Sequence, residues 1–237
     1  MSRYLFLLLL IIIESNTGWG QNTSADYIKK GNEKALAEKY DDAVKEFSEA
    51  IKLDPQNANA FYCRANAYFD LGKFDEAIND YSSCIKIDPA FTSAYYNRGN
   101  TYYEIKDFSK AIEDFTKTIA LDSTMYDAFF DRGNTYYKIK EYEKAIDDLN
   151  KGLSIKPDFP DGYYDRANTK FQLGQYNDAI TDFSKAIELN PNETDYYFNR
   201  AITYFNLEMN TEGCADLEKA QKLGDDGASD YMNEFCK

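Results

Sequence analysis

Residues 92–125 read TSAYYNRGNTYYEIKDFSKAIEDFTKTIALDSTM, and this stretch decides the fold because its pattern recurs along the chain. One face of a 3.6-residue helix, at i, i+3, i+4 and i+7, is occupied by Tyr95, Arg98, Gly99 and Tyr102. A second amphipathic pattern begins at Phe108 and continues to Ile119. The stretch therefore predicts two amphipathic helices joined by a short turn.

The same pattern recurs every 34 residues, so the chain is a repeat protein. Small residues show the step most clearly, at Ala43, Ala77, Ala111, Ala145, Ala179 and Gly213. Prolines, which cannot continue a helix, close four of the units at Pro55, Pro89, Pro157 and Pro191. The predicted units are 24–57, 58–91, 92–125, 126–159, 160–193 and 194–227. The sixth is degenerate, and 228–237 restarts the pattern as a capping helix over its apolar face.

The order of aromatic, small and closing proline residues, clearest in the unit that contains Ala94-Tyr95-Tyr96-Asn97-Arg98-Gly99, resembles the tetratricopeptide repeat family. The resemblance covers the whole chain after residue 23. It implies an all-α, right-handed superhelical solenoid of six helical hairpins plus the capping helix. It also implies a concave groove that is lined by the first helix of each unit.

Composition limits the classes of function. Asp and Glu number 41 against 27 Lys and Arg, so the formal net charge of −14 disfavours nucleic acid as a partner. The chain contains no histidine, which excludes Ser-His-Asp and Cys-His catalysis and histidine-ligated metal sites. No phosphate-binding loop or nucleophile elbow is present either. We therefore expect a protein that is not an enzyme and binds no cofactor or metal.

The N-terminus has the pattern of a secretory signal peptide, residues 1–20. Arg3 precedes an apolar run from Tyr4 to Ile13, which is too short to span a bilayer. Small residues at Gly18 and Gly20 fit a cleavage site before Gln21. The prediction is an exported protein, periplasmic or secreted, with no membrane span after cleavage. The alternative is a chain anchored to the membrane by an uncleaved N-terminal segment.

Two charged series recur in step with the units. Arginine recurs on the first helix, and aspartate recurs on the second helix sixteen residues later. We expect structural ion pairs, because a partly buried guanidinium requires a partner; a row of anion-binding arginines is the alternative. The predicted pairs are Arg64–Asp80, Arg98–Asp114, Arg132–Asp148, Arg166–Asp182 and Arg200–Asp216.

An asparagine series occupies a position that the family's geometry places on the concave face. Its amides suit the backbone of an extended peptide, and aromatic side chains at helical spacing lie on the same face. The predicted asparagines are Asn66, Asn100, Asn134 and Asn168. The predicted aromatics are Tyr62, Phe69, Tyr96, Tyr103, Phe130, Tyr137, Tyr164 and Phe171, for which packing between units is the alternative.

Some tetratricopeptide repeat domains bind the C-termini of chaperones with a carboxylate clamp, and the resemblance allows the clamp positions to be compared residue by residue. The clamp-lysine positions hold Tyr62, Tyr96, Phe130 and Tyr164 instead. Other cationic clamp positions hold acidic residues such as Asp127, Asp131 and Asp165. A carboxylate clamp is therefore excluded, and the acidic groove favours a neutral or basic segment.

The sequence predicts one disulfide among the four cysteines. Cys214 lies on the second helix of the sixth unit and Cys236 on the capping helix, about equally far from the turn between these helices. If the two helices are antiparallel neighbours, the cysteines can meet, and an oxidising compartment would join them in a disulfide. Two free thiols are the alternative. Cys63 is expected to face the groove and Cys84 the core, so a bond between them is the less favoured alternative to two free thiols. Zinc is a poor fit because no C-x-x-C spacing occurs.

The function that these features favour is non-covalent protein binding. The leading hypothesis is an exported scaffold or adaptor that binds an extended peptide or partner protein in the concave groove. The alternative is a periplasmic chaperone or envelope assembly factor that binds many unfolded clients weakly.

Overall fold

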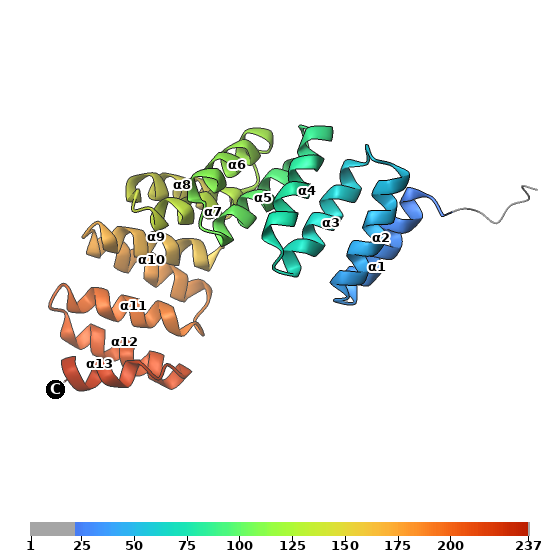
Figure 1. Cartoon of the computed structure of the whole chain (residues 1–237). Coiled ribbons are helices and arrows are strands. Elements are labelled where there is room, and N and C mark those ends of the chain that lie inside the picture. The colour runs from blue at the N-terminus through green and yellow to red at the C-terminus, as the bar shows by residue number, and fades with distance from the viewer. Residues whose placement is uncertain (1–21, 237) are drawn as a thin grey trace, which may run out of the picture.

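The structure, a computed structural model, describes residues 22–236; the predicted signal peptide lies outside the described residues. Across this part of the chain there are thirteen α-helices and no strands. Successive helices form hairpins that stack side by side into a curved solenoid (Figure 1). The predicted all-α solenoid with a C-terminal capping helix is confirmed. The helices are α1 (Ser24–Leu36), α2 (Tyr40–Leu53), α3 (Ala58–Asp70), α4 (Phe74–Ile87), α5 (Thr92–Glu104), α6 (Phe108–Leu121), α7 (Tyr126–Lys138), α8 (Tyr142–Ile155), α9 (Pro160–Gln172), α10 (Tyr176–Leu189), α11 (Thr194–Phe205), α12 (Asn210–Leu223) and α13 (Ala228–Phe235).

Each hairpin closes around one large side chain of its second helix. These side chains are at most 1% exposed and repeat at Phe47, Tyr81, Phe115, Leu149, Phe183 and Leu217. The first helix presents a small residue opposite each one. At Gly99, for example, an added Cβ would lie 2.9 Å from the Phe115 ring, so the absence of a side chain lets α5 and α6 approach closely. Small residues on the first helices therefore allow the two helices of a hairpin to pack closely.

The turn inside each hairpin contains one residue with positive φ. Glycine supplies it at Gly72 and Gly174, whereas non-glycine residues supply it at Glu38, Lys106, Lys140 and Glu208. Glycine adopts this conformation without a steric penalty, and other residues do so only where the surrounding structure enforces it. Glycine therefore marks only two of these turns in the sequence.

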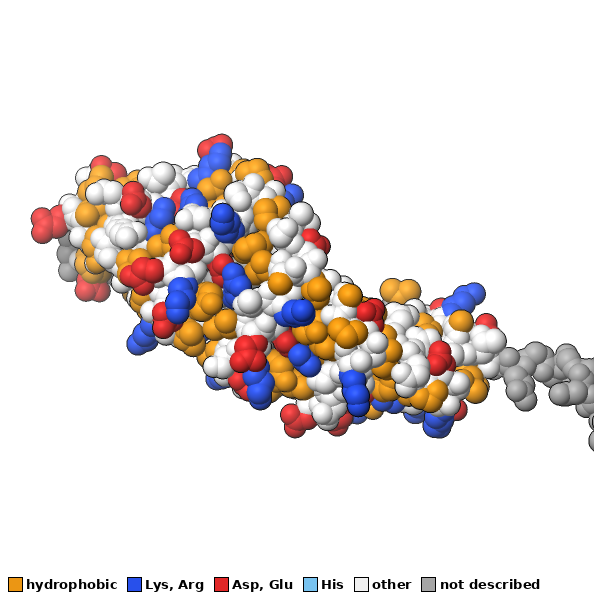
Figure 2. All heavy atoms as spheres, turned by 90° about the horizontal axis from the view of Figure 1, so that it is seen from above, with side chains coloured by type: hydrophobic (Ala, Val, Ile, Leu, Met, Phe, Trp, Pro, Cys, Tyr) orange, Lys and Arg blue, Asp and Glu red, His pale blue; other side chains and the backbone are white. Residues whose placement is uncertain are grey.

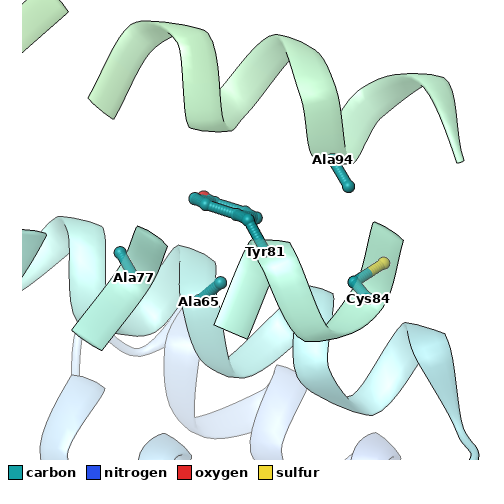
Figure 3. Packing of buried hydrophobic residues seen from close by; sticks show 5 residues of the cluster. All are labelled: Ala65, Ala77, Tyr81, Cys84 and Ala94. Atoms are coloured by element: carbon teal, nitrogen blue, oxygen red, sulfur yellow. The ribbon is translucent and has the colours of Figure 1, made fainter. Parts of the chain in front are cut away.

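The apolar core continues from one unit to the next. Tyr81 and Cys84 project from α4 toward α5, which adds Ala94 to the same buried cluster (Figure 3). Cys84 and half-buried Cys63 are free thiols. Burial raises the pKa of Cys63 to about 11 and that of Cys84 to about 12, so both remain protonated at neutral pH.

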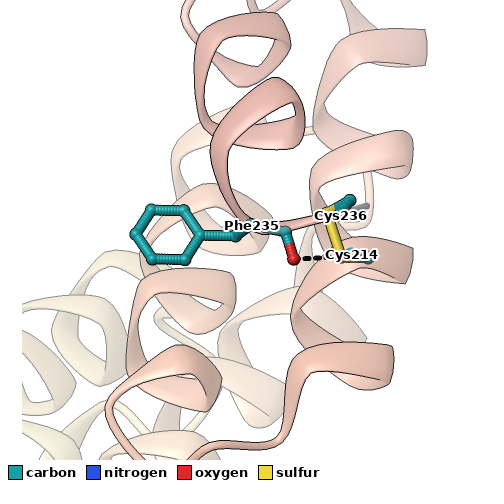
Figure 4. Close-up of a disulfide and its surroundings, with 3 residues drawn as sticks. All are labelled: Cys214, Phe235 and Cys236. Atoms are coloured by element: carbon teal, nitrogen blue, oxygen red, sulfur yellow. Dashed lines mark hydrogen bonds between the residues drawn. A yellow bond between two sulfur atoms is a disulfide. The ribbon is translucent and has the colours of Figure 1, made fainter.

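The last helix, α13, covers the C-terminal end of the solenoid. The structure joins Cys214 of α12 to Cys236, directly after α13, by a disulfide whose Cα atoms are 5.7 Å apart (Figure 4). Two ring pairs add apolar contact between α11 and α13, Phe198–Tyr231 and Phe205–Phe235, with centroids 5.1 Å and 4.8 Å apart. The buried methyl of Ala228 completes the contact.

Candidate binding groove

Each repeated arginine holds three helices together. Arg98 on α5 donates from Nε and Nη2 to both carboxylate oxygens of Asp114 on α6, at 2.7 and 2.8 Å. Its remaining terminal nitrogen, Nη1, donates to Ser82 Oγ on α4 of the preceding unit, at 2.8 Å. We call this three-helix arrangement the arginine clasp. All five predicted Arg–Asp pairs lie in such clasps, and the third partners are Ser48, Ser82, Thr116, Asn150 and Ser184.

In each clasp an aspartate already neutralises the arginine, and all three guanidinium nitrogens donate to protein groups. The five aspartates of the pairs are between 3% and 7% exposed, and each accepts a bidentate bond from its arginine. At least one aromatic ring makes a cation–π contact with each clasp arginine; at Arg98, Tyr95 and Tyr102 both do, with ring centroids 5.7 and 5.9 Å from the guanidinium carbon. The arginines are therefore structural in this arrangement. The third partners were not among the predicted residues, although Ser48, Ser82 and Ser184 follow the same 34-residue step.

Three consecutive pockets follow the first helices of the second to fifth units. The first lies between α3 and α5, has a volume of about 270 Å³ and is lined by Asn66, Phe69, Asp70, Tyr81, Asn97 and Asn100. The central pocket, of about 250 Å³, is lined by Asn100, Tyr103, Phe115, Asp131 and Asn134. The third, of about 240 Å³, is lined by Tyr103, Asn134, Tyr137, Lys138, Asp165 and Asn168. We call these three pockets together the groove.

The four predicted asparagines all line these pockets, and two of them lie where neighbouring pockets meet. Asn100 lines the first and the central pocket, and Asn134 lines the central and the third. Two of the asparagines also bond across units. Asn66 Oδ1 accepts from Asn97 Nδ2 at 2.9 Å, and Asn134 Nδ2 donates to Asp165 Oδ2 at 2.8 Å. The series thus contributes both to the groove surface and to contacts between neighbouring units.

The predicted aromatics divide into two groups. Phe69, Tyr103 and Tyr137 line the pockets, while each also contacts the first ring of its own second helix, as Tyr103 does with Phe108 at 5.5 Å. Phe171 makes the same intra-unit contact with Tyr176 but lines none of these pockets.

The other group packs between units. The Tyr62 hydroxyl accepts from Asn97 Nδ2 of the next unit at 3.0 Å, and the Tyr96 hydroxyl donates to Asp131 of the next unit at 2.6 Å. The Tyr164 ring contacts that of Tyr196, with centroids 5.1 Å apart. These three side chains line none of the three pockets, so the packing interpretation describes them better than a ligand contact.

Phe130 departs furthest from its predicted place in the groove. It is only 3% exposed and packs against Phe159 at 4.8 Å, inside the core. Glycines at 152 and 162 make the room, because a Cβ on Gly152 or Gly162 would lie 2.7 or 2.6 Å from the Phe130 ring. In this structure Phe130 therefore lies in the core and lines none of the three pockets.

Carboxylates give the groove its electrostatic character. Burial raises the pKa of Asp131 and of Asp165 from the ordinary value of 3.8 to about 6. Burial also raises the pKa of Asp70 in the first pocket and of Asp127 beside Asp131. Among the residues that line the three pockets, Lys138 is the only cation.

Charges elsewhere on the surface are mixed. On the face seen in Figure 2, Lys and Arg side chains alternate with Asp and Glu around hydrophobic patches, without a continuous basic surface. None of the helices between residues 22 and 236 is long and apolar enough to cross a membrane.

Comparison with known proteins identifies the family. The sequence model described as TPR repeat matches residues 31–72, 65–106, 133–173 and 167–207, and the one described as tetratricopeptide repeat matches 92–125. The chain belongs to the tetratricopeptide repeat (TPR) family. A search of curated proteins finds no match to this TPR protein.

Solved structures resemble this TPR protein over most of its length. The crystal structure of MamA is 27% identical and covers 74% of this chain and 96% of its own, with a TM-score of 0.68. PilW, described as a widely conserved type IV pilus biogenesis factor, is 22% identical over 88% of this chain and 98% of its own, with a TM-score of 0.75. YrrB, described as a TPR protein with an unusual peptide-binding site, is 20% identical over 79% and 97%, with a TM-score of 0.69. At these sequence identities, the likeness to PilW and to YrrB shows a shared fold.

Proposed function

We propose that this TPR protein is an exported scaffold or adaptor that binds an extended peptide or partner protein in its groove. The observation that carries the proposal is the row of three pockets, which share Asn100, Asn134 and Tyr103 at their boundaries. A peptide backbone has donors and acceptors that primary amides can match, and the half-buried rings supply apolar contact area. The work is binding rather than catalysis.

Export rests on two observations. Residues 1–20 have the composition of a signal peptide, and Cys214 and Cys236 are joined in a bond that persists in oxidising compartments. The intact mass of the protein isolated from its producing cell tests this part. Loss of residues 1–20 supports export by signal cleavage, whereas a full-length mass in the membrane fraction supports the anchored alternative.

Peptide selection tests the groove. The whole chain is expressed, and the resulting protein is used to select binders from a display library of random decapeptides. A groove variant carries Asn100→Ala, Asn134→Ala and Tyr137→Ala. A matched control carries Asn79→Ala and Asn177→Ala, which are exposed on α4 and α10. Circular dichroism must show that all three proteins are equally helical.

The proposal expects a defined set of peptides that bind the wild type and the control but are lost with the groove variant. If all three proteins select the same peptides, the groove is not the binding surface. Weak binding to many unrelated unfolded peptides, still dependent on the groove, would instead favour the chaperone alternative. Crosslinked capture from the native envelope fraction, followed by mass spectrometry, would then identify the natural partner.

A further inference from the structure

The central pocket differs from its two neighbours in its hydrogen bonds. On either side, an asparagine amide bonds to the side chain of the next unit, as Asn66 does with Asn97 and Asn134 does with Asp165. Within residues 22–236, no equivalent bond joins Asn100 to Asp131. Asp131 instead accepts from Tyr96 through Oδ2 alone, at 2.6 Å.

One carboxylate oxygen of Asp131 is therefore available to a ligand. In the described part of the chain, no hydrogen bond reaches Asp131 Oδ1. Every fully enclosed side-chain nitrogen and oxygen there has a partner, so Oδ1 is not fully enclosed. The carboxylate nevertheless lies in a poorly solvated place, since burial raises the pKa of Asp131 to about 6. A cation that contacted Oδ1 would compensate for this lost hydration.

The charges around the pocket have the same sign. Asp127 on α7 and Asp165 on α9 both lie near enough to interact electrostatically with Asp131. Lys138, the nearest cation lining the groove, lies in the third pocket beside Asp165 and does not line the central one. Among the described residues, no group of three potential metal ligands occurs, so a side-chain cation suits the site better than a metal ion.

We propose that the central pocket binds the guanidinium group of an arginine side chain on the partner. Asp131 Oδ1 would accept one N–H, the amide oxygens of Asn100 and Asn134 would be further acceptors, and the ring of Tyr103 would contact the guanidinium plane. Arginine fits better than lysine because its fork presents several planar donors and loses hydration more easily. This inference rests on the proposed peptide-binding function and names the side chain that anchors the peptide.

The test uses the peptides selected by the groove. Each is resynthesised with arginine, with lysine or with citrulline, which keeps the shape of arginine but carries no charge. Binding is measured by fluorescence anisotropy to the wild type, to Asp131→Asn and to Asp147→Asn. The last is the matched control, because Asp147 is exposed on α8 and its substitution changes the net charge equally. In Asp131→Asn the amide oxygen can still accept from Tyr96.

For the wild type and Asp147→Asn, we expect citrulline to weaken binding about tenfold or more, as for the loss of a charge-assisted hydrogen bond. For Asp131→Asn, the arginine and citrulline peptides should bind about equally. The comparison of arginine and citrulline peptides on the wild type needs no protein variant. It therefore tests the arginine anchor even if Asp131→Asn folds poorly.

Other outcomes separate the two proposals. Groove-dependent peptides that lack arginine, or that tolerate citrulline, would overturn the arginine anchor and leave the peptide-binding function standing. Absence of any groove-dependent peptide would overturn both. Sedimentation of the protein alone tests a further alternative. If the wild type self-associates and Asp131→Asn does not, the pocket binds a second copy of this chain instead of a partner's arginine, and the inference is overturned.

Discussion

Arg98 shows how one side chain can stabilise the boundary between two units. Its bidentate bond to Asp114 closes one hairpin, and its bond to Ser82 ties that hairpin to the preceding one. The ion pair was predictable because both charges repeat at a fixed separation. The serine was harder to predict, because its hydroxyl enters the site only after the units have stacked.

Removing either partner of Arg98 should destabilise the protein to different extents. Asp114→Ala leaves a largely buried guanidinium without its counter-ion and should lower the free energy of unfolding by about 3–5 kcal/mol. Ser82→Ala removes one neutral acceptor and should lower it by about 0.5–1.5 kcal/mol. Urea denaturation followed by circular dichroism measures both. Ser83→Ala is the control, because Ser83 bonds only to the backbone of its own helix; equal effects at 82 and 83 would contradict the clasp.

The buried carboxylates of the groove should make stability depend on pH. Because the pKa values of Asp131 and Asp165 rise to about 6 on folding, ionisation of these groups opposes folding above that pH. The Asp131→Asn, Asp165→Asn double variant should therefore be more stable than the wild type at pH 7.5, by roughly 1–3 kcal/mol per site at most. The gain should be constant above pH 6 and shrink as the pH falls toward 3.8. Thermal unfolding between pH 4 and 8 checks this, and Asp147→Asn should show no such gain.

At the scale of single helices, the end of the solenoid depends on a covalent bond. Helix α13 has only eight residues and exposes part of Tyr231 and Phe235. The Cys214–Cys236 bond, with a sequence separation of 22, restricts the unfolded state of this segment. Cys214→Ser should destabilise the cap by roughly 3 kcal/mol on the loop-entropy scale. Hydrogen exchange of the Cys236 amide, which bonds to Met232 O, should accelerate accordingly. A reductant should reproduce the effect in the wild type and add nothing in the variant.

Gly162 on helix α9 leaves the space that the buried ring of Phe130 occupies. Gly162→Ala would place a Cβ 2.6 Å from the Phe130 ring and should destabilise the protein by about 1–3 kcal/mol. Combining it with Phe130→Leu should recover part of that loss, because the smaller side chain vacates the contact. Denaturation of the two single variants and the double variant measures this coupling. Additive effects would show that Phe130 does not fill the space at Gly162.

These elements also show how far the sequence could predict the molecule. Helical periodicity and the 34-residue step were sufficient for the hairpins, because each unit carries the whole pattern. The position of Phe130 could not be predicted from this pattern, because it depends on two glycines elsewhere in the chain. Tyr62, Tyr96 and Tyr164 share the spacing of groove residues, yet their rings or hydroxyls meet the next unit. The raised pKa values of Asp131 and Asp165 likewise arise only from stacking.

At the scale of the whole molecule, each helix packs mainly against its chain neighbours, as the side-by-side hairpins in Figure 1 show. Stability in such a solenoid is approximately a sum of unit and boundary terms. Asp114→Ala should therefore weaken the middle of the chain and uncouple unfolding of α1–α4 from that of α7–α12. Native-state hydrogen exchange would then show two groups of amides with different opening free energies. A single group, uniformly lowered, would indicate that the solenoid unfolds as one cooperative block.

The arginine clasp has a consequence for how such a chain changes over generations. Every clasp arginine finds its hydroxyl or amide partner sixteen residues before it and its carboxylate sixteen residues after it. Because both bonds depend only on these relative offsets, a tandem duplication of one 34-residue segment in the gene would give the added arginine both partners at once. The binding surface can therefore lengthen in a single genetic event, without a new interface having to arise by point mutation.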